Sequence, residues 1–262
     1  MAHLQSTNKR AICYIDGFNL YFGSMKKRWR EYKWLDLYEF GKSLNRQYNV
    51  EHVKYFTAKV KPDHLNREIH IRQELYLRAL ATISEITVIH GHYSKHKKRL
   101  PLAFEPSWFT KVIKFEEKGS DVNLAVHAVA DGFNDKYDLA IIVSNDSDLV
   151  EPIRIITQEL RKNVEVFSPH SNASAALAKW ASSQKKIRKH HLADHQFPEK
   201  MNDKHGILEK PHKWKVVENK DGTETDDDSG SVANNSSKPS LMELLKFYYR
   251  GFRKDYFTRS NR

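Results

Sequence analysis

Apolar residues along the chain fall into short continuous runs separated by longer segments of helical spacing. Residues 11–16 (AICYID) and 139–143 (LAIIV) are apolar runs that end abruptly in polar residues, which is typical of strands buried on both faces of a sheet. Shorter runs at 53–60, 85–89 and 164–167 predict further strands. Because strands and helical segments alternate, the pattern predicts an α/β domain with a mostly parallel sheet flanked by helices.

The helical segments are recognised by apolar residues three or four positions apart. They are predicted near residues 38–48, 65–82, 120–133, 149–160 and 175–180. We expect Ser120 to cap the exposed amides of its helix, because serine is a preferred cap. The apolar positions of that helix, and therefore its predicted buried face, are Val122, Ala125, Val126, Val129 and Phe133. Asp131, Asp135 and Asp138 are predicted to lie at the far edge of the sheet, in the turn before the strand 139–143.

Three segments lack this regular pattern. Residues 90–99 (HGHYSKHKKR) are polar and basic, and predict a loop or the start of an exposed hairpin that reaches Trp108. Past residue 195 the chain becomes polar, so we predict a folded domain over 1–195 and a flexible linker over 196–240. The basic and aromatic tail 241–262 predicts a short helix, which either docks on the domain or binds a separate protein partner.

The composition narrows the class of protein. Cys13 is the single cysteine of 262 residues, which excludes an internal disulfide and a cysteine-based zinc site. No apolar stretch approaches the roughly 20 residues that span a bilayer, and the first ten residues lack the apolar core of a signal peptide. We therefore expect a soluble, cytoplasmic protein with no integral membrane segment. Its oligomeric state stays open.

The charge of the chain favours a polyanionic partner. The formal net charge is +11, which suits RNA or another nucleic acid, or an anionic membrane surface. Charge alone does not choose between these partners, and surface lysines that only keep the protein in solution remain an alternative.

Four aspartates stand where a parallel sheet places ligand-binding residues. Asp16 and Asp146 follow predicted strands, Asp148 comes two residues later, and Asp121 lies in the first turn of a helix. Ligands of such sheets bind beyond the carboxyl ends of the strands, where strand order reverses. Two carboxylates about 4 Å apart repel by roughly 4 kcal/mol at an effective dielectric of about 20, so a cluster requires a cation or a protonated member. Carboxylate oxygens favour Mg²⁺ or Mn²⁺, which activate water for phosphodiester hydrolysis.

Simpler roles are open for several of these acids. Asp148 can cap the helix that begins near residue 149, and Asp121 can serve as a first-turn partner of the helix dipole. Asp16 has the fewest alternatives. Glu116 and Glu117 can supply an extra acid, although a charged run before a helix is usually solvated.

Basic side chains form three predicted patches. The first is 26–34 (KKRWREYKW), where cations alternate with Trp29, Tyr32 and Trp34, a mixture suited to backbone phosphates and unpaired bases. The second is the basic loop, and the third is 185–191 (KKIRKHH). The predicted RNA-binding residues are Lys26, Lys27, Arg28, Lys97, Lys98 and Arg99. A solvated helix face with buried aromatic rings is the alternative for the first patch. A zinc site at His90, His92 and His96 is disfavoured by the neighbouring cations.

Three sequence blocks, taken in order, resemble one known family. The blocks are YIDGFNLY (14–21), EKGSDVNLA (117–125) and IIVSNDSDLVEPI (141–153). They resemble the signature motifs of NYN domains of the LabA type, which belong to the PIN-like nuclease group. The resemblance covers roughly residues 10–185, and it implies a PIN-like α/β fold and hydrolysis of RNA with Mg²⁺ or Mn²⁺.

The resemblance also implies roles for individual residues. It makes Asp16 the first metal ligand, Asp146 and Asp121 further ligands or water-holders, and Asp148 a supporting ligand. Asn19 would orient substrate or a metal-bound water, and Ser144 would brace the loop. Products with a 5′-phosphate and a 3′-hydroxyl are what attack by a metal-activated water implies.

The sequence disfavours several other enzyme classes and leaves one non-enzymatic function open. A dinucleotide-binding enzyme is disfavoured because Asp16-Gly17-Phe18-Asn19 is not a glycine-rich turn, and 41–43 (GKS) lacks the preceding glycine of a P-loop. An aspartyl phosphatase usually has a second acid where this chain has Phe18. The alternative from another class is a non-catalytic RNA-binding or adaptor module that keeps a PIN-like fold.

Overall fold

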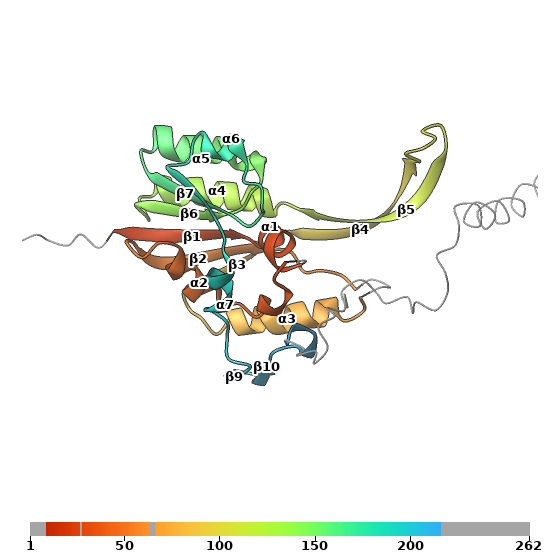
Figure 1. Cartoon of the computed structure of the whole chain (residues 1–262), viewed down its shortest axis with the longest axis horizontal. Coiled ribbons are helices and arrows are strands. Elements are labelled where there is room, and N and C mark those ends of the chain that lie inside the picture. Colours follow the sequence, from red (N-terminus) through yellow and green to blue (C-terminus); the bar gives the residue numbers. More distant parts are fainter. Residues whose placement is uncertain (1–8, 27, 63–65, 216–262) are drawn as a thin grey trace, which may run out of the picture. The chain divides into compact units, whose positions relative to one another are not determined.

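The structure is a computed structural model, and it describes residues 9–26, 28–62 and 66–215. A six-stranded sheet lies at its centre (Figure 1). In spatial order its strands are β3 (Ile86–His90), β2 (Asn49–Thr57), β1 (Arg10–Asp16), β6 (Leu139–Val143), β7 (Asn163–Ser168) and β8 (Ser183–Lys186). Every neighbouring pair is parallel, which confirms the predicted α/β fold. Strand order reverses between β1 and β6.

Helices cover both faces of the sheet (Figure 1). They are α1 (Gly17–Leu20), α2 (Leu37–Leu44), α3 (Ile69–Leu80), α4 (Ser120–Phe133), α5 (Val150–Arg154), α6 (Ala175–Ala178) and α7 (Lys189–Ala193). Short π-helical and 3₁₀ segments extend α1 at 21–25 and α5 at 147–149 and 155–159, and two separate 3₁₀ turns lie at 30–32 and 212–214. Alternate residues of β1 belong to different cores: Cys13 and Ile15 pack with α2 and α3, whereas Ile12 and Tyr14 pack with α4 and α5. Burial on both faces explains why β1 and β6 are continuous apolar runs.

Helix α4 buries only part of the face that its apolar residues predict, since Ala125 and Val129 pack against the core as partly buried side chains. Val122 and Val126 are 60% exposed and Phe133 is 77% exposed, whereas Leu124 and Ala128 are buried. The reason is a polar residue: buried Asp131 accepts a hydrogen bond from the Tyr14 hydroxyl at 2.9 Å and pairs with Lys54 and Lys136. These contacts turn the Asp131 side of the helix toward the sheet, because a buried carboxylate requires partners of this kind.

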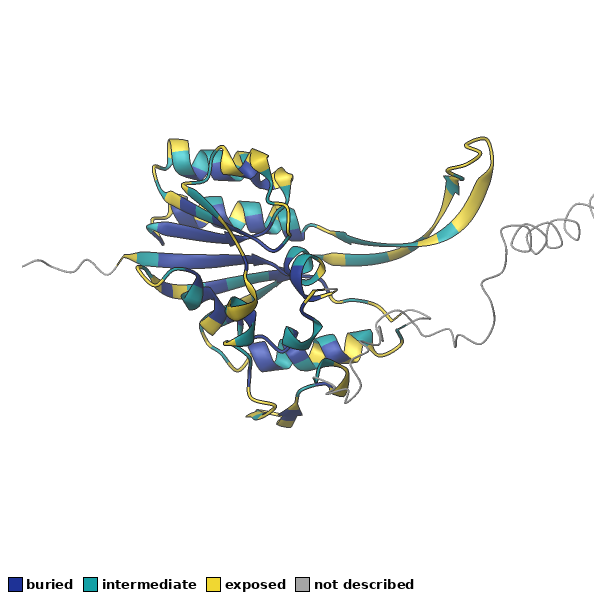
Figure 2. Ribbon diagram, in the orientation of Figure 1, coloured by how far each residue is buried: buried dark blue, intermediate teal, exposed yellow. Residues whose placement is uncertain are grey.

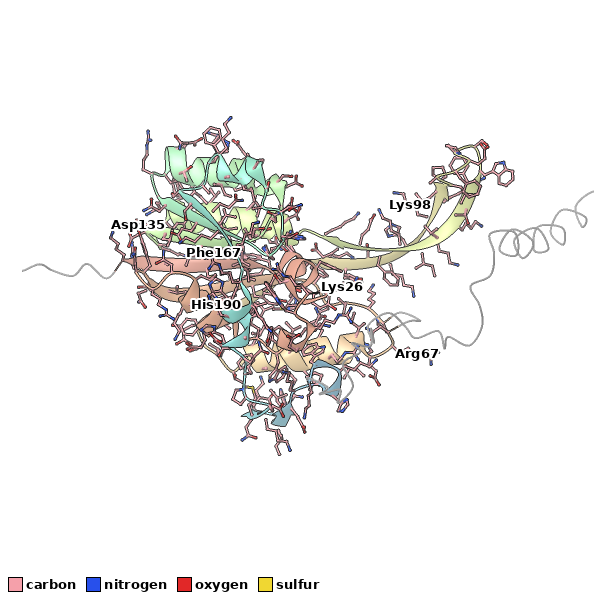
Figure 3. All side chains as sticks on the ribbon, viewed as in Figure 1. Lys26, Arg67, Lys98, Asp135, Phe167 and His190 are labelled. Carbon is pink, nitrogen blue, oxygen red and sulfur yellow. The ribbon has the colours of Figure 1, made fainter. Side chains whose placement is uncertain are left out.

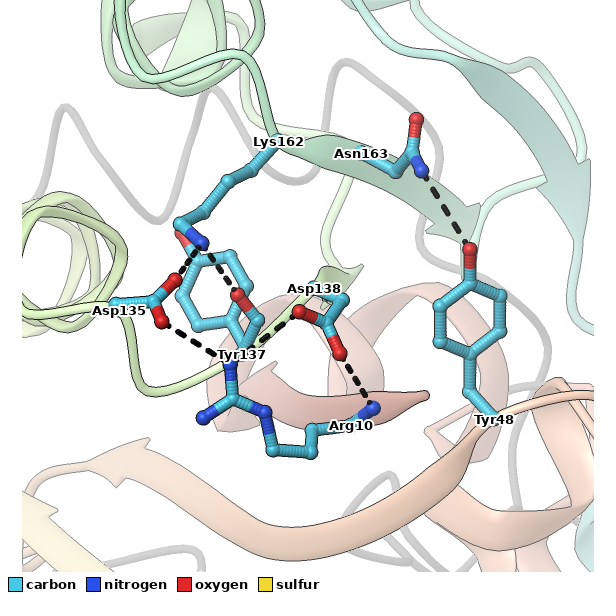
Figure 4. Close-up of polar contacts among 7 residues, drawn as sticks. All are labelled: Arg10, Tyr48, Asp135, Tyr137, Asp138, Lys162 and Asn163. Atoms are coloured by element: carbon cyan, nitrogen blue, oxygen red, sulfur yellow. Dashed lines mark hydrogen bonds and ion pairs between the residues drawn. The ribbon is translucent and has the colours of Figure 1, made fainter. Parts of the chain in front are cut away.

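At the amino ends of the strands, a second set of ion pairs joins the turn after α4 to β1 (Figure 4). Arg10 pairs with Asp135 at 3.4 Å and with Asp138 at 3.3 Å, and Lys162 donates to the Tyr137 carbonyl at 2.8 Å. The positions of Asp135 and Asp138 match the predicted turn, whereas the prediction is wrong for Asp131, which lies within α4 and is buried. This edge is opposite to the one that carries Asp16, because all the strands of the sheet run the same way.

The predicted loop at 90–99 is part of a long hairpin, and the structure settles the alternative left by the sequence. Strand β4 (His92–Pro101) pairs with β5 (Phe109–Lys118) in an antiparallel sheet of its own. We call residues 92–118 the arm. It extends away from the six-stranded sheet, and most of its length is exposed or only partly buried (Figure 2).

Residues 196–214 form structure where the sequence predicts a linker. Strands β9 (Lys200–Asp203) and β10 (Gly206–Glu209) make a small hairpin beside α3. Phe197 and Leu208 are buried, and the Trp34 indole donates to the Pro198 carbonyl at 2.8 Å. The segment is polar in sequence because only a few of its side chains face the core. The predicted linker beyond residue 215 and the tail 241–262 lie outside the described residues. Within the described ranges, no helix is both long and apolar enough to cross a bilayer.

Candidate acidic site

The candidate site lies at the carboxyl edge of the sheet, where strand order reverses. Ile15 of β1 is level with Val143 of β6, so the next residues, Asp16 and Ser144, emerge side by side. This is the place at which parallel sheets bind ligands. The fold therefore brings together the first and third sequence blocks, which lie more than a hundred residues apart in the chain.

Asp16 is buried and held by hydrogen bonds on both carboxylate oxygens. It is 8% exposed. Oδ1 accepts from the Asn19 backbone amide at 2.9 Å, which caps α1, and Oδ2 accepts from the Ser144 hydroxyl at 3.1 Å. The following residue must be glycine, because a Cβ at Gly17 would lie 2.8 Å from the Phe56 carbonyl oxygen. The Asp16 carboxylate is thus fixed in place while each oxygen keeps a lone pair for another ligand.

The loop after β6 is braced by side chains that the sequence blocks contain. The Asn145 amide donates to the Asn19 side-chain oxygen at 3.0 Å, and the Asp146 amide donates to the Ser144 hydroxyl at 3.1 Å. Asn145 also accepts from the Ser168 hydroxyl at 3.0 Å. Ser144 therefore contacts both Asp16 and the backbone of Asp146. Asn145 was not singled out from the sequence, and its signal was only its place between Ser144 and Asp146.

The electrostatics of the site are acidic. Burial raises the pKa of Asp16 to about 6, against the hydrogen bonds from Asn19 and Ser144, and the negative charges of Asp146 and Glu117 raise it further. Burial and the charge of Asp16 also raise the pKa of Tyr55 to about 12. Asp146 and Glu117 are thus the acids whose charges act on Asp16. A bound cation would offset the repulsion between these negative charges.

Glu117 is the site residue that sequence reasoning undervalued. It lies at the end of β5, and its Oε1 accepts from the Ser120 backbone amide at 3.0 Å. Glu117, and not Ser120, therefore caps α4, which corrects the predicted serine cap. The chain turns into the helix at Gly119 with φ of +87°. The buried Ser120 hydroxyl has no hydrogen-bond partner in the part of the chain that is described.

Asp121 and Asp148 are placed differently from Asp16 and Asp146. Asp121 lies in the first turn of α4, as predicted. The cap before Leu149 is Asp146, whose Oδ1 accepts from the Asp148 amide at 3.0 Å, so the alternative that Asp148 is the cap is wrong. Among the described residues, no group of three histidine, cysteine or acidic side chains is close enough to hold one ion. The four predicted acids therefore do not form a single compact ligand set.

The donor set still fits a hydrated hard cation. Its donor atoms are carboxylate oxygens. The Ser120 hydroxyl, which has no hydrogen-bond partner among the described residues, lies beside the Glu117 carboxylate. Both line the space next to Gly91, because a Cβ there would lie 2.7 Å from the Glu117 Oε1 and from the Ser120 Oγ. Mg²⁺ is commonly held by one or two protein carboxylates and keeps several waters. Asp16 and Asp146 supply two carboxylates of that kind.

The first basic patch is only partly available to a ligand. Trp34 is fully buried and Trp29 is 8% exposed, so neither ring can stack on a base, and the alternative of buried aromatic rings holds for both. The Lys26 ammonium lies 4.7 Å from the centre of the Phe22 ring, and the Arg28 guanidinium lies 4.1 Å from that of Trp29. Lys27 lies outside the described residues. Figure 3 shows Lys26 near α1 and Lys98 out on the arm, with Asp135 at the other end of the sheet.

Comparisons with known protein families, proteins and solved structures find the following similarities. The NYN domain profile matches residues 10–201. The chain is 30% identical over 244 residues to 6-hydroxy-3-succinoylpyridine 3-monooxygenase HspA of Pseudomonas putida, covering 80% of this chain and 77% of that protein. A crystal structure of a protein of unknown function from Vibrio parahaemolyticus aligns with 74% of this chain and 100% of its own, at 19% identity and a TM-score of 0.47.

Proposed function

Because this chain belongs to the NYN domain family, and its sequence blocks resemble those of the PIN-like nuclease group, we propose that it is a metal-dependent ribonuclease. It hydrolyses RNA phosphodiester bonds at the acidic site. The observation that carries the proposal is the placement of Asp16 beside the 144–146 loop at the carboxyl edge of β1 and β6, with the charge of Asp146 acting on it.

In this proposal Asp16 and Asp146 hold Mg²⁺ or Mn²⁺, and Asp121 and Asp148 hold water around it. A bound dication lowers the pKa of a coordinated water and offsets the negative charge that develops on the phosphate. The residues of the chain position these groups. Asn19 and Ser144 keep the Asp16 carboxylate in one orientation, as their hydrogen bonds to both of its oxygens require. Cleavage then leaves a 5′-phosphate and a 3′-hydroxyl.

Replacement of Asp16 tests the proposal. We expect Asp16→Asn to lower the rate of RNA cleavage by about a hundredfold or more, because the neutral amide cannot serve as an anionic ligand. Cleavage of end-labelled unstructured and structured RNA is measured in Mg²⁺, Mn²⁺ and chelator. The matched control is Asp135→Asn, whose carboxylate is exposed at the opposite edge of the sheet and whose φ of 53° suits asparagine. An unchanged rate in Asp16→Asn would contradict the mechanism.

Two other functions are distinguished by the same preparation. An adaptor module would bind RNA equally well with and without chelator and cleave none of it. The second follows from the name of the Pseudomonas putida relative, which is that of a monooxygenase acting on a hydroxylated pyridine. Incubation with 6-hydroxy-3-succinoylpyridine, dioxygen and a nicotinamide reductant, followed by mass spectrometry, tests that activity. An oxygenated product without RNA cleavage in any metal would replace the nuclease proposal.

A further inference from the structure

The arm presents two faces of different chemistry. In its register Tyr93 is opposite Glu117, Lys95 is opposite Phe115, and Lys97 is opposite Ile113. Directly opposed side chains of an antiparallel pair share a face, and neighbours along each strand alternate. All odd-numbered residues of β4 and β5 therefore share one face, which we call the odd face, and all even-numbered residues share the even face.

The odd face carries a row of aromatic rings that begins beside the acidic site. Phe22 stacks on Phe18 with their ring centres 6.2 Å apart, and Phe18 stacks on Tyr93 at the same spacing with the planes inclined by 9°. Tyr93 then contacts Phe115 at 6.2 Å. Phe18 is only two residues from Asp16, so the row leads from the site directly onto the arm.

Cations on the odd face are available to a ligand. Lys95, Lys97, Arg99 and Lys111 are all exposed. The Lys95 ammonium lies 5.3 Å from the centre of the Phe115 ring, and the Arg99 guanidinium lies 5.0 Å from that of Phe109, which is 51% exposed. Among the described residues, no carboxylate lies within ion-pair distance of these four cations.

The even face is different because its carboxylate pairs with cations of the same face, whereas Glu117 of the odd face is in no ion pair among the described residues. Glu116 pairs with Lys114, and lies 3.5 Å from His96 and 3.8 Å from Lys118. These pairs neutralise much of the positive charge near the base of that face. Lys98, although adjacent to Lys97 and Arg99 in sequence, projects to the even face. The predicted triplet Lys97, Lys98 and Arg99 is therefore divided between two surfaces.

We propose that the odd face of the arm binds single-stranded RNA and leads it to the acidic site. Bases stack on the aromatic row, and phosphates contact Lys95, Lys97, Arg99 and Lys111. Exposed or partly exposed rings interleaved with cations are the surface that single strands require, since the base faces of a duplex are already stacked on one another. The inference rests on the proposed ribonuclease function for the destination of the strand, but binding is measured separately from cleavage.

The test compares two neighbouring lysines that project to opposite faces. Binding of a labelled single-stranded RNA of about 16 nucleotides to the full chain is followed by fluorescence anisotropy in chelator, at ionic strengths around 0.15 M. Lys97→Glu is expected to raise Kd by about tenfold or more, and Lys98→Glu by less than about threefold. Lys97→Ala should also reduce the slope of log Kd against log salt by about 0.7, the value for one lost phosphate contact on a single strand.

Stacking and strandedness are tested in the same assay. Phe109→Ala is expected to raise Kd for the single strand by roughly fivefold or more, because the variant loses the stacking of one base on the Phe109 ring. A fully paired duplex of the same sequence should bind more weakly than the single strand and be less affected by this change. Far-ultraviolet circular dichroism checks that each variant is folded, which we expect because Lys97, Lys98 and Phe109 are exposed.

Each other outcome overturns either the inference or the function on which it rests, and the two failures differ. Equal effects of Lys97→Glu and Lys98→Glu would overturn the odd face as the binding surface. A change of oligomeric mass in sedimentation, without a change in RNA affinity, would show that the face binds a second copy of the chain instead. Normal face-dependent binding with no cleavage in Mg²⁺ or Mn²⁺ would leave the arm as proposed and remove the ribonuclease function.

Discussion

Asp16 is a residue whose charge the folded protein tolerates only with difficulty. Its carboxylate is buried, and Asp146 and Glu117 add negative charge around it. The hydrogen bonds from Asn19 and Ser144 compensate only in part, since the pKa of Asp16 stays raised to about 6. Such a residue stabilises the folded state when it is protonated, and a bound cation would have the same effect on the ionised form.

The pH dependence of stability follows from this residue. Because the pKa of Asp16 is about 6 in the folded protein and 3.8 in the unfolded reference, its contribution to stability is present below pH 3.8 and is lost as pH rises through 6. The loss amounts to about 3 kcal/mol at most. Asp16→Asn does not lose this stability as pH rises, because its side chain does not ionise. In chelator, its free energy of unfolding should therefore increase relative to that of the natural chain between about pH 4 and about pH 7.5.

Urea unfolding at several pH values measures this difference. Added Mn²⁺ should stabilise the natural chain and have little effect on Asp16→Asn, because only the carboxylate gains a counter-ion. A difference between the two proteins that is independent of pH would show that Asp16 is not ionised at neutral pH.

Some residues of the site could be placed from the sequence alone, and others could not. Asp16, Asn19 and Ser144 follow buried strands within continuous blocks, so their place at one sheet edge could be predicted. Glu117 could not be placed, because its role depends on the end of a hairpin strand that brings it back beside the sheet. Trp29 and Trp34 show the opposite error: their basic neighbours suggest a binding surface, whereas both rings are buried.

Among the elements, α2 depends on a single capping side chain. The Asp36 carboxylate accepts from the amides of Tyr38 at 2.9 Å and Glu39 at 3.1 Å. Asp36→Ala should lower the free energy of unfolding by about 1 kcal/mol, because two amides at the helix start lose their partner. Asp36→Asn keeps an oxygen that accepts these hydrogen bonds, so it should lower the free energy of unfolding by only a few tenths of the loss in Asp36→Ala. Urea unfolding of both variants measures the two losses. Equal costs for the two variants would point to the charge rather than the cap.

Helices and strands could be predicted where the pattern of apolar residues in the sequence matches the pattern of burial in the fold. Strand β6 (139–143) has no polar member and is buried throughout, so its place was evident. Helix α4 was predicted in extent but not in orientation, since hydrophobicity alone does not reveal that Asp131 has partners inside. The arm was the least predictable element, because strands that pack on no core have no alternation of apolar and polar residues to recognise them by.

At the scale of the whole molecule, residues 196–214 belong to the folded body. Leu208 is buried in the same core as β1, whereas its neighbour Ile207 is 74% exposed. Leu208→Ala should lower the free energy of unfolding by about 2 to 5 kcal/mol, because it leaves a cavity in that core. Ile207→Ala removes a similar side chain from the same strand and should change it by about 0.5 kcal/mol or less.

Thermal or urea unfolding of these two variants decides how the chain is divided. Matching small effects would mean that the β9–β10 hairpin is detached from the body in solution, as a linker beginning at residue 196 would be. A large effect of Leu208→Ala alone would move the boundary of the folded domain past residue 209.

The alternation of side chains along the arm constrains how it can vary in length. If one residue were added to each strand near the base, every position farther out would be turned to the opposite side of the ribbon, and its lysines would leave the face that Tyr93 occupies. Adding two residues to each strand would restore the arrangement. Arms that serve the same purpose in related chains should therefore lengthen or shorten by even steps, a parity rule that follows from the pleat itself.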